Sequence, residues 1–142
     1  LLEHDIFDLM PEGAHSIERD VYEKIAASGA LNGFPFGGMF VDAGTPTSFV
    51  EASQACISSH RFSSGSVQDD SWLGPDSHCL GRVSGSSIGP GATVAEGCNV
   101  RNSVILEGAV IEENCLLESC LIGKGATISA GTVMSGEIVN HI

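Results

Sequence analysis

The segment Ile88-Gly-Pro-Gly-Ala-Thr-Val94 returns 17 residues later as Ile105-Leu-Glu-Gly-Ala-Val-Ile111, and after the same interval again as Ile122-Gly-Lys-Gly-Ala-Thr-Ile128. The repeating stretch extends from Ile88 to Ile138. Gly and Ala keep their places in every copy: Gly91, Gly108 and Gly125; Ala92, Ala109 and Ala126. A short fixed period with Gly at one phase is typical of a solenoid, in which successive repeats stack on one another.

The spacing of the large apolar residues predicts the shape of each repeat. They fall six, six and five positions apart, at 88, 94, 100 and 105, which describes a coil with three short strands. Side chains alternate between the two faces of a strand, so the first residue of each side and the residue four places on are expected to point inward. These second inward positions are Ala92, Cys98 and Val104.

We therefore predict a mainly β fold, in which residues 71–142 form a parallel β-helix of about four coils stacked at roughly 4.8 Å. Two buried columns are expected along it: Ile88, Ile105 and Ile122 in one, and Val104, Leu121 and Ile138 in the other. The hexads resemble the hexapeptide repeat of left-handed β-helices. That resemblance implies a left-handed coil.

The residues before the repeats predict two helices. Ser16 is a suitable N-cap for a helix over residues 17–28, with Gly29 as its C-terminal stop. Thr45 followed by Pro46 is an N-cap with Pro at the first helical position, and it opens a second helix that continues to about residue 58. These helices belong to an incomplete α/β segment.

A β-hairpin is predicted between the two helices. Phe34-Pro35-Phe36 and Met39-Phe40-Val41 flank Gly37-Gly38, and a two-residue Gly-Gly link between such runs is typical of a hairpin turn. The stretch from His60 to Asp70 has no period and is rich in Ser, Gly and Asp. It is expected to be a linker or an irregular entry into the β-helix.

The composition excludes several classes of partner. With 18 acidic and 6 basic residues, the 142-residue chain has a formal charge of −12, so we expect neither nucleic acid nor a membrane as a partner. No segment approaches 18 apolar residues. The five cysteines include no C-x-x-C pair, which indicates a reducing compartment, and a cytoplasmic location is expected. Because the sequence begins at Leu1 and not at Met, we expect a fragment of a longer protein.

Three segments resemble a known enzyme family. They are Ser16-Ile-Glu-Arg-Asp-Val-Tyr-Glu-Lys-Ile25, Phe40-Val-Asp-Ala-Gly-Thr-Pro46 and Phe49-Val-Glu-Ala52. In this order, and followed by hexapeptide repeats, they resemble the end of the catalytic domain of sugar-phosphate nucleotidyltransferases, in particular the mannose-1-phosphate guanylyltransferase-like branch. The resemblance implies that residues 1–62 are the C-terminal remnant of a catalytic domain, 63–70 a linker and 71–142 the β-helix domain.

The resemblance also implies an activity. Enzymes of this family join a nucleoside triphosphate to a sugar 1-phosphate and release pyrophosphate, here of the GDP-mannose type. The Gly-rich loop that holds the nucleotide is absent from these 142 residues. Both substrates and Mg²⁺ are therefore expected in the complete enzyme, with no cofactor bound to this fragment.

Two residues are candidate site residues by the same resemblance. Asp42 corresponds to an Asp that helps to hold the magnesium ion, and Glu18 corresponds to a Glu beside the sugar site. Each also has a structural explanation, Asp42 as a turn residue that leaves a strand and Glu18 as an acidic residue favoured by the helix dipole. The sequence leaves both explanations open.

Two rival functions remain. Hexapeptide-repeat acyltransferases share the β-helix and need a catalytic His, for which the candidates are His78 and His141. Alternatively, the β-helix is a non-catalytic oligomerisation module, since solenoids have open edges at their ends. On either the enzyme or the module hypothesis we expect a homo-oligomer, because the first helix and the predicted hairpin lack a layer to cover them.

Overall fold

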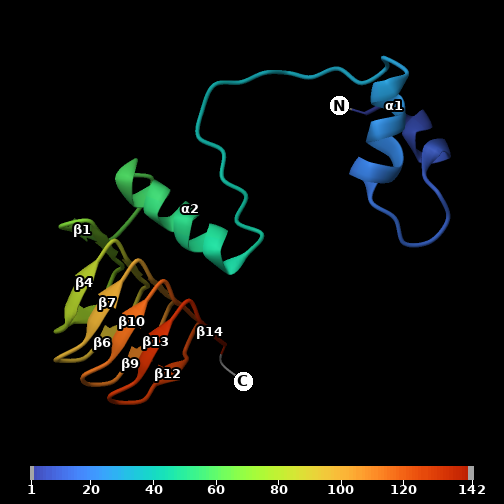
Figure 1. Cartoon of the computed structure of the whole chain (residues 1–142). Coiled ribbons are helices and arrows are strands. Elements are labelled where there is room, and N and C mark those ends of the chain that lie inside the picture. Colours follow the sequence, from blue (N-terminus) through green and yellow to red (C-terminus); the bar gives the residue numbers. More distant parts are fainter. Residues whose placement is uncertain (1, 141–142) are drawn as a thin grey trace. The chain divides into compact units, whose positions relative to one another are not determined.

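The structure is a computed structural model that describes residues 2–140. The chain forms two compact units, Leu1–Met39 and Phe40–Ile142. Figure 1 shows the helical elements of the first unit and, in the second, a stack of short strands accompanied by one longer helix. No helix within residues 2–140 combines the length and apolar character needed to cross a bilayer.

The second unit contains the predicted left-handed parallel β-helix. Its first coil consists of β2 (Ser71–Leu73), β3 (His78–Cys79) and β4 (Arg82–Ser84). The following strands are β5 (Ser87–Ile88), β6 (Thr93–Val94), β7 (Asn99–Arg101), β8 (Val104–Ile105), β9 (Val110–Ile111), β10 (Leu116–Glu118), β11 (Leu121–Ile122), β12 (Thr127–Ile128), β13 (Val133–Ser135) and β14 (Ile138–Val139). Within residues 2–140 they complete four coils and begin a fifth, which confirms the predicted fold.

Every third strand pairs with its equivalent in the next coil, so the β-helix has three faces. Sheet A has the order β1-β2-β5-β8-β11-β14, sheet B contains β3, β6, β9 and β12, and sheet C contains β4, β7, β10 and β13. All of these pairs are parallel except the first, because β1 (Ser66–Gln68) runs antiparallel to β2. The period of 17 residues is the register of the sheets, as in the pairing of Ile88 with Ile105.

The predicted isoleucine column forms the centre of the core. Ile88, Ile105 and Ile122 have no exposed surface, and Leu73 and Val139 extend the column at its two ends. Burying one such side chain stabilises a fold by roughly 1.5–3 kcal/mol. A repeat of one Ile per coil therefore makes each coil depend on its neighbours.

The prediction of a second buried column is wrong about the direction in which its side chains point. Val104, Leu121 and Ile138 do stack in register, but on the outer face of sheet A, where Val104 is buried and Ile138 is 48% exposed. Val104 directly precedes the inward-facing Ile105, so the alternation of the strand turns it outward. The five-residue side turns its corner one residue early, and a small residue takes the inward place: Ser86, Ser103 and Cys120.

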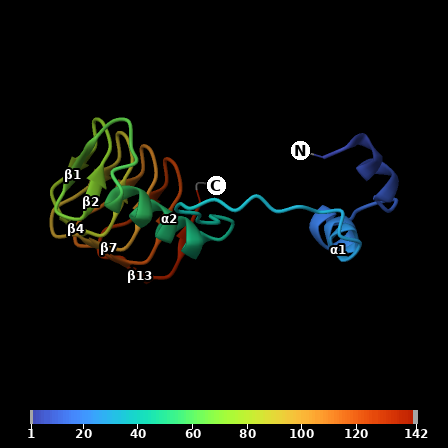
Figure 2. The ribbon, with the colours of Figure 1, turned by 90° about the horizontal axis from the view of Figure 1, so that it is seen from above.

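The second predicted helix is confirmed as α2 (Pro46–Ser58). Thr45 caps it through a reciprocal arrangement with Ser48, in which the Ser48 N–H donates to Thr45 Oγ1 over 3.2 Å and the Thr45 N–H to Ser48 Oγ over 3.0 Å. The helix contacts β2 and β5 of sheet A (Figure 2). Its side chains Val50 and Ile57 are buried.

A polar contact also joins α2 to the β-helix. The Gln54 Nε2 donates to the carbonyl oxygen of Gly85 over 3.1 Å and to Asn102 Oδ1 over 3.2 Å. Both acceptors lie at the corner that leads into sheet A. The apolar and polar contacts together explain why α2 belongs to the same compact unit as the β-helix.

The first unit contains short helical elements: η1 (His4–Leu9), a 3₁₀-helix, then η2 (Ile17–Tyr22), a π-helix, which continues directly into α1 (Glu23–Ala27). The helix predicted over residues 17–28 is thus present, with a wider first half than expected. Val21 is fully buried and Ile6 nearly so. These two side chains provide the small core of this unit.

The predicted hairpin is absent from the described residues. The stretch 30–43 contains no strand, and Phe34, Phe36 and Phe40 are 92%, 68% and 79% exposed. An isolated two-stranded ribbon is marginal in water unless a further strand or helix covers its apolar side. Since nothing covers these phenylalanines here, the Gly37-Gly38 turn signal is not sufficient.

Candidate functional site

Asp42 lies in the extended segment that leads into α2. Its Oδ1 accepts a hydrogen bond of 3.0 Å from the backbone N–H of Gly44. A Cβ on Gly44 would lie 3.2 Å from the same oxygen, so glycine at this place gives the carboxylate room. Asp42 is therefore a turn residue of the Asx type, and it is exposed.

The same geometry leaves part of the Asp42 carboxylate accessible. Within residues 2–140 the structure records no hydrogen bond to its second oxygen, Oδ2. Asp42 also precedes the N-terminus of a 13-residue helix, where a negative charge is favourable. The side chain can thus serve as a turn residue and offer one hard oxygen to a cation at the same time.

Glu18 lies in the first turn of η2 and is exposed. Ser16 and Asp20, and not Glu18, cap the N-terminus of this helix. The Ser16 N–H donates to Asp20 Oδ2 over 2.7 Å, and the Arg19 N–H donates to Ser16 Oγ over 3.4 Å. Glu18 forms no side-chain hydrogen bond within the described part of the chain, so its carboxylate faces solvent.

Glu18 belongs to the first compact unit and Asp42 to the second. Residues 2–140 contain no group of three or more His, Cys, Asp or Glu side chains placed to hold a metal ion. A magnesium ion at Asp42 would need most of its ligands from phosphates, waters and residues elsewhere.

Of the two histidine candidates of the acyltransferase hypothesis, only His78 lies among the described residues. His78 is exposed on the outer face of sheet B, where Thr93 is its neighbour in the next coil. Its ring forms no hydrogen bond among the described residues, whereas a catalytic base is held by an orienting group. His141 lies outside the described residues.

The five cysteines are all free thiols. Cys98 and Cys115 stack at the corner between sheets B and C, whereas Cys79 lies in β3 and pairs with Val94. All three thiols donate to backbone carbonyls: Cys79 to Gly81, Cys98 to Glu112 and Cys115 to Ser129. Burial raises the pKa of the Cys79 and Cys98 thiols above their ordinary value of 9.0. A protonated thiol is a poor nucleophile, so Cys79 and Cys98 are better suited to packing than to attack on a substrate.

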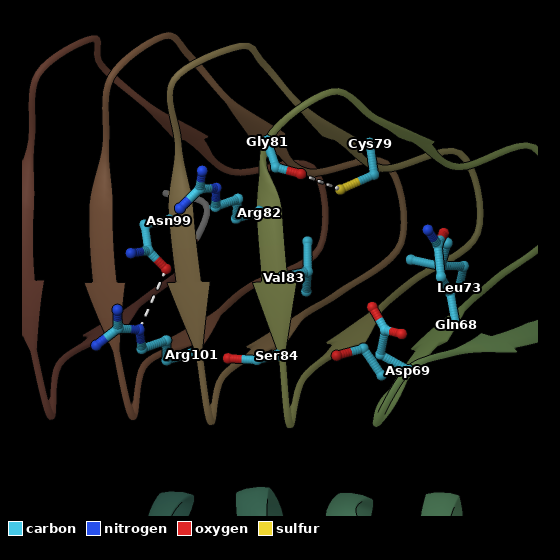
Figure 3. A pocket seen from close by; sticks show the side chains of 11 residues that line it. Gln68, Asp69, Leu73, Cys79, Gly81, Arg82, Val83, Ser84, Asn99 and Arg101 are labelled. Carbon is cyan, nitrogen blue, oxygen red and sulfur yellow. Dashed lines mark hydrogen bonds between the residues drawn. The ribbon is translucent and has the colours of Figure 1, made fainter.

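A cavity of about 450 Å³ lies at the first coil. In Figure 3, Arg82, Asn99 and Arg101 project from neighbouring strands on one side of Val83, and Asp69 lies on the other side. The apolar lining comes from inward-facing residues of the first coil that have no coil before them, Leu73, Cys79 and Val83. The cavity is thus a mixed site with a basic side and an acidic one.

Sequence reasoning did not identify this basic pair, although a signal was present. Arg82 and Arg101 are 19 residues apart, which is one period of 17 plus two. That interval places two residues on the same face of neighbouring strands, because side chains of a strand return to one face every second residue. The period of the repeat is therefore sufficient to predict that the two arginines lie near each other.

Comparison with known proteins identifies the family of the β-helix. Residues 63–140, more than half of the chain, match the family model described as the GMPPB C-terminal domain. The match begins shortly before β1 and extends to the last described residue. No curated protein matches the chain. The chain therefore belongs to the GMPPB C-terminal domain family, the hexapeptide-repeat β-helix of GDP-mannose pyrophosphorylases, as its resemblance predicted.

Proposed function

We propose that this chain is the C-terminal portion of a sugar-1-phosphate nucleotidyltransferase that makes GDP-mannose from a nucleoside triphosphate and a sugar 1-phosphate and releases pyrophosphate. The observation that carries the proposal is the family match over residues 63–140. In the proposed enzyme, residues 1–62 are the end of the catalytic domain, 63–70 the linker and 71–142 the β-helix domain. The residues that bind the nucleotide would lie in another part of the enzyme.

Asp42 is the proposed metal ligand of this chain. Its accessible oxygen, beside a helix N-terminus, suits a hard cation that completes its shell with phosphate oxygens. When bound, Mg²⁺ would neutralise charge on the transferred phosphoryl group. Asp42 would hold its position through the bond from Gly44, and Glu18 would contact the sugar.

The β-helix is proposed to serve assembly or regulation in a homo-oligomer. The exposure of Phe34 and Phe36 supports association, because large apolar side chains that are exposed close together are typical of surfaces that a partner covers. The charge of −12 disfavours nucleic acid and anionic membranes as partners, and five free thiols are compatible with a cytoplasmic location.

The test is an assay of pyrophosphate release by the complete enzyme with GTP, mannose 1-phosphate and Mg²⁺. Asp42→Asn should lower turnover by about a hundredfold or more, because one carboxylate ligand of the metal is lost. Glu51→Gln is the matched control, since it removes one exposed acidic charge from α2 and should leave turnover unchanged.

The isolated 142-residue chain should neither bind GTP nor release pyrophosphate. Micromolar binding of GTP to this chain would show that the nucleotide site has been placed in the wrong part of the enzyme. A complete protein with no activity on any sugar 1-phosphate would instead favour the non-catalytic oligomerisation module. Full activity of the Asp42→Asn enzyme would remove the metal role of Asp42.

A further inference from the structure

The outer face of sheet C differs from the rest of this acidic protein. Outward positions on its strands form two columns along the β-helix: Arg82, Asn99, Leu116 and Val133 in one, and Ser84, Arg101, Glu118 and Ser135 in the other. The face is basic at its first two coils; beyond them one column is apolar, with Leu116 and Val133, and the other is polar, with Glu118 and Ser135. The basic end is also the rim of the 450 Å³ cavity.

Neither arginine of this face forms an ion pair with an acidic side chain in the part of the chain that the structure describes. Within residues 2–140 the one ion pair joins Lys124 to Glu107 over 2.8 Å, although acidic residues outnumber basic ones 18 to 6. Glu118 is the neighbour of Arg101 in the next coil, but its carboxylate accepts a hydrogen bond of 3.3 Å from Asn102 Nδ2. The face therefore has two positive charges available for a ligand.

The register places these charges close enough to act together. Asn99 is the direct neighbour of Arg82, and Arg101 follows Asn99 by two positions on the same face. Diagonal neighbours of this kind have Cβ atoms roughly 7–8 Å apart, within reach of two long side chains. The Arg101 Nε–H donates to Asn99 Oδ1 over 3.2 Å, which fixes that guanidinium and leaves its terminal nitrogens for a ligand.

The opposite side of the cavity has different chemistry. It is formed by Gln68 and Asp69, at the end of β1 and in the turn that joins β1 to β2. A carboxylate disfavours an anion, but it accepts hydrogen bonds from hydroxyl groups. A ligand that fits both sides carries a phosphate at one end and hydroxyl groups at the other.

We propose that this cavity binds a phosphorylated small molecule that bears hydroxyl groups. Arg82 and Arg101 hold the phosphate, because planar guanidinium groups donate paired hydrogen bonds to its oxygens. Asp69 and Gln68 bind the hydroxyl groups from the opposite side of the cavity. The site lies on the β-helix, so it does not depend on the proposed nucleotidyltransferase activity.

The experiment is calorimetric titration of the purified chain at low salt with three probes: glucose 6-phosphate, inorganic phosphate and glucose. Glucose 6-phosphate should bind saturably, phosphate more weakly, and glucose not at all. Arg82→Gln and Arg101→Gln should each weaken the binding of glucose 6-phosphate about tenfold. Added salt should weaken it as well.

Lys124→Gln is the matched control, because it removes a positive charge from a different part of the β-helix and should leave the binding unchanged. Unchanged melting temperatures would show that the exposed variants still fold. The absence of saturable binding of glucose 6-phosphate up to about 10 mM would overturn the proposal, as would equal affinities of wild type and both arginine variants.

A further variant tests the hydroxyl side separately. Asp69→Asn removes the carboxylate, so it should weaken the binding of glucose 6-phosphate relative to that of inorganic phosphate. The same ratio of affinities in wild type and variant would overturn the role of Asp69 and reduce the site to a phosphate clamp.

Discussion

The backbone N–H of Ser103 donates to the hydroxyl oxygen of Ser86 in the preceding coil over 3.0 Å. The next coil repeats the arrangement, since the Cys120 N–H donates to Ser103 Oγ, also over 3.0 Å. Both serines are buried. A ladder of hydroxyl groups therefore runs through the corner between sheets C and A, where the repeat predicts an apolar column.

Loss of one hydroxyl should destabilise the β-helix. Ser103→Ala leaves the buried N–H of Cys120 without its acceptor, which costs about 1–3 kcal/mol of unfolding free energy. Urea denaturation followed by circular dichroism measures this. Ser135→Ala, at an exposed position of β13, is the control and should have little effect. Equal midpoints for the two variants would mean that the ladder contributes nothing.

The two columns of sheet A should respond differently to truncation. Ile105→Ala opens a cavity in the core and should lower the unfolding free energy by about 2–5 kcal/mol. Ile138→Ala removes the same atoms from a side chain that is 48% exposed and should cost much less. Comparable losses in denaturant titrations would contradict the outward register of Ile138.

The buried thiols predict a loss of stability at alkaline pH. Burial raises the pKa of Cys79 and Cys98 above the ordinary value of 9.0, so the folded state favours the protonated thiol. This contribution is complete below pH 9.0 and is lost as the pH rises through the folded-state pKa. The urea midpoint should therefore fall above pH 9.0, and less steeply in Cys98→Ala. Parallel curves for wild type and variant would exclude Cys98 as a cause.

The exposed phenylalanines should drive self-association. Light scattering of the chain at high concentration should give a mass above that of one copy, and the double variant Phe34→Ser, Phe36→Ser should shift it toward the monomer. Leu80→Ser, which alters a residue of the β-helix that is 77% exposed, is the control and should leave the mass unchanged. A strictly monomeric wild type would contradict the prediction of a homo-oligomer.

The sequence predicts most of the β-helix because the 17-residue period of the repeat is also the offset between paired residues of neighbouring coils. The five-residue side breaks the rule that holds for the six-residue sides. Counting four places on from Val100 predicts an inward Val104, whereas alternation counted back from Ile105 turns Val104 outward and Ser103 inward. The hairpin at Gly37-Gly38 failed for a different reason. A turn signal is local, whereas the stability of a ribbon depends on what covers it.

The candidate sites show the same division. Local signals placed Thr45 and Ser16 correctly as helix caps, because caps depend on a few adjacent residues. The roles of Asp42 and Glu18 stay predictions, because they depend on substrates and on residues elsewhere. Arg82 and Arg101 meet only through the stacking of coils, which sequence reasoning had treated as a source of core residues alone.

The antiparallel strand β1 covers the edge of sheet A at the N-terminal end of the β-helix. A solenoid made of parallel strands can accept a further coil, from its own chain or from another molecule, wherever a strand edge of the right polarity is free. On sheet A that edge is already occupied by β1, which pairs with β2 in the opposite sense. A second solenoid therefore cannot pair directly with β2 to continue the parallel register of sheet A, and β1 opposes head-on polymerisation through this face.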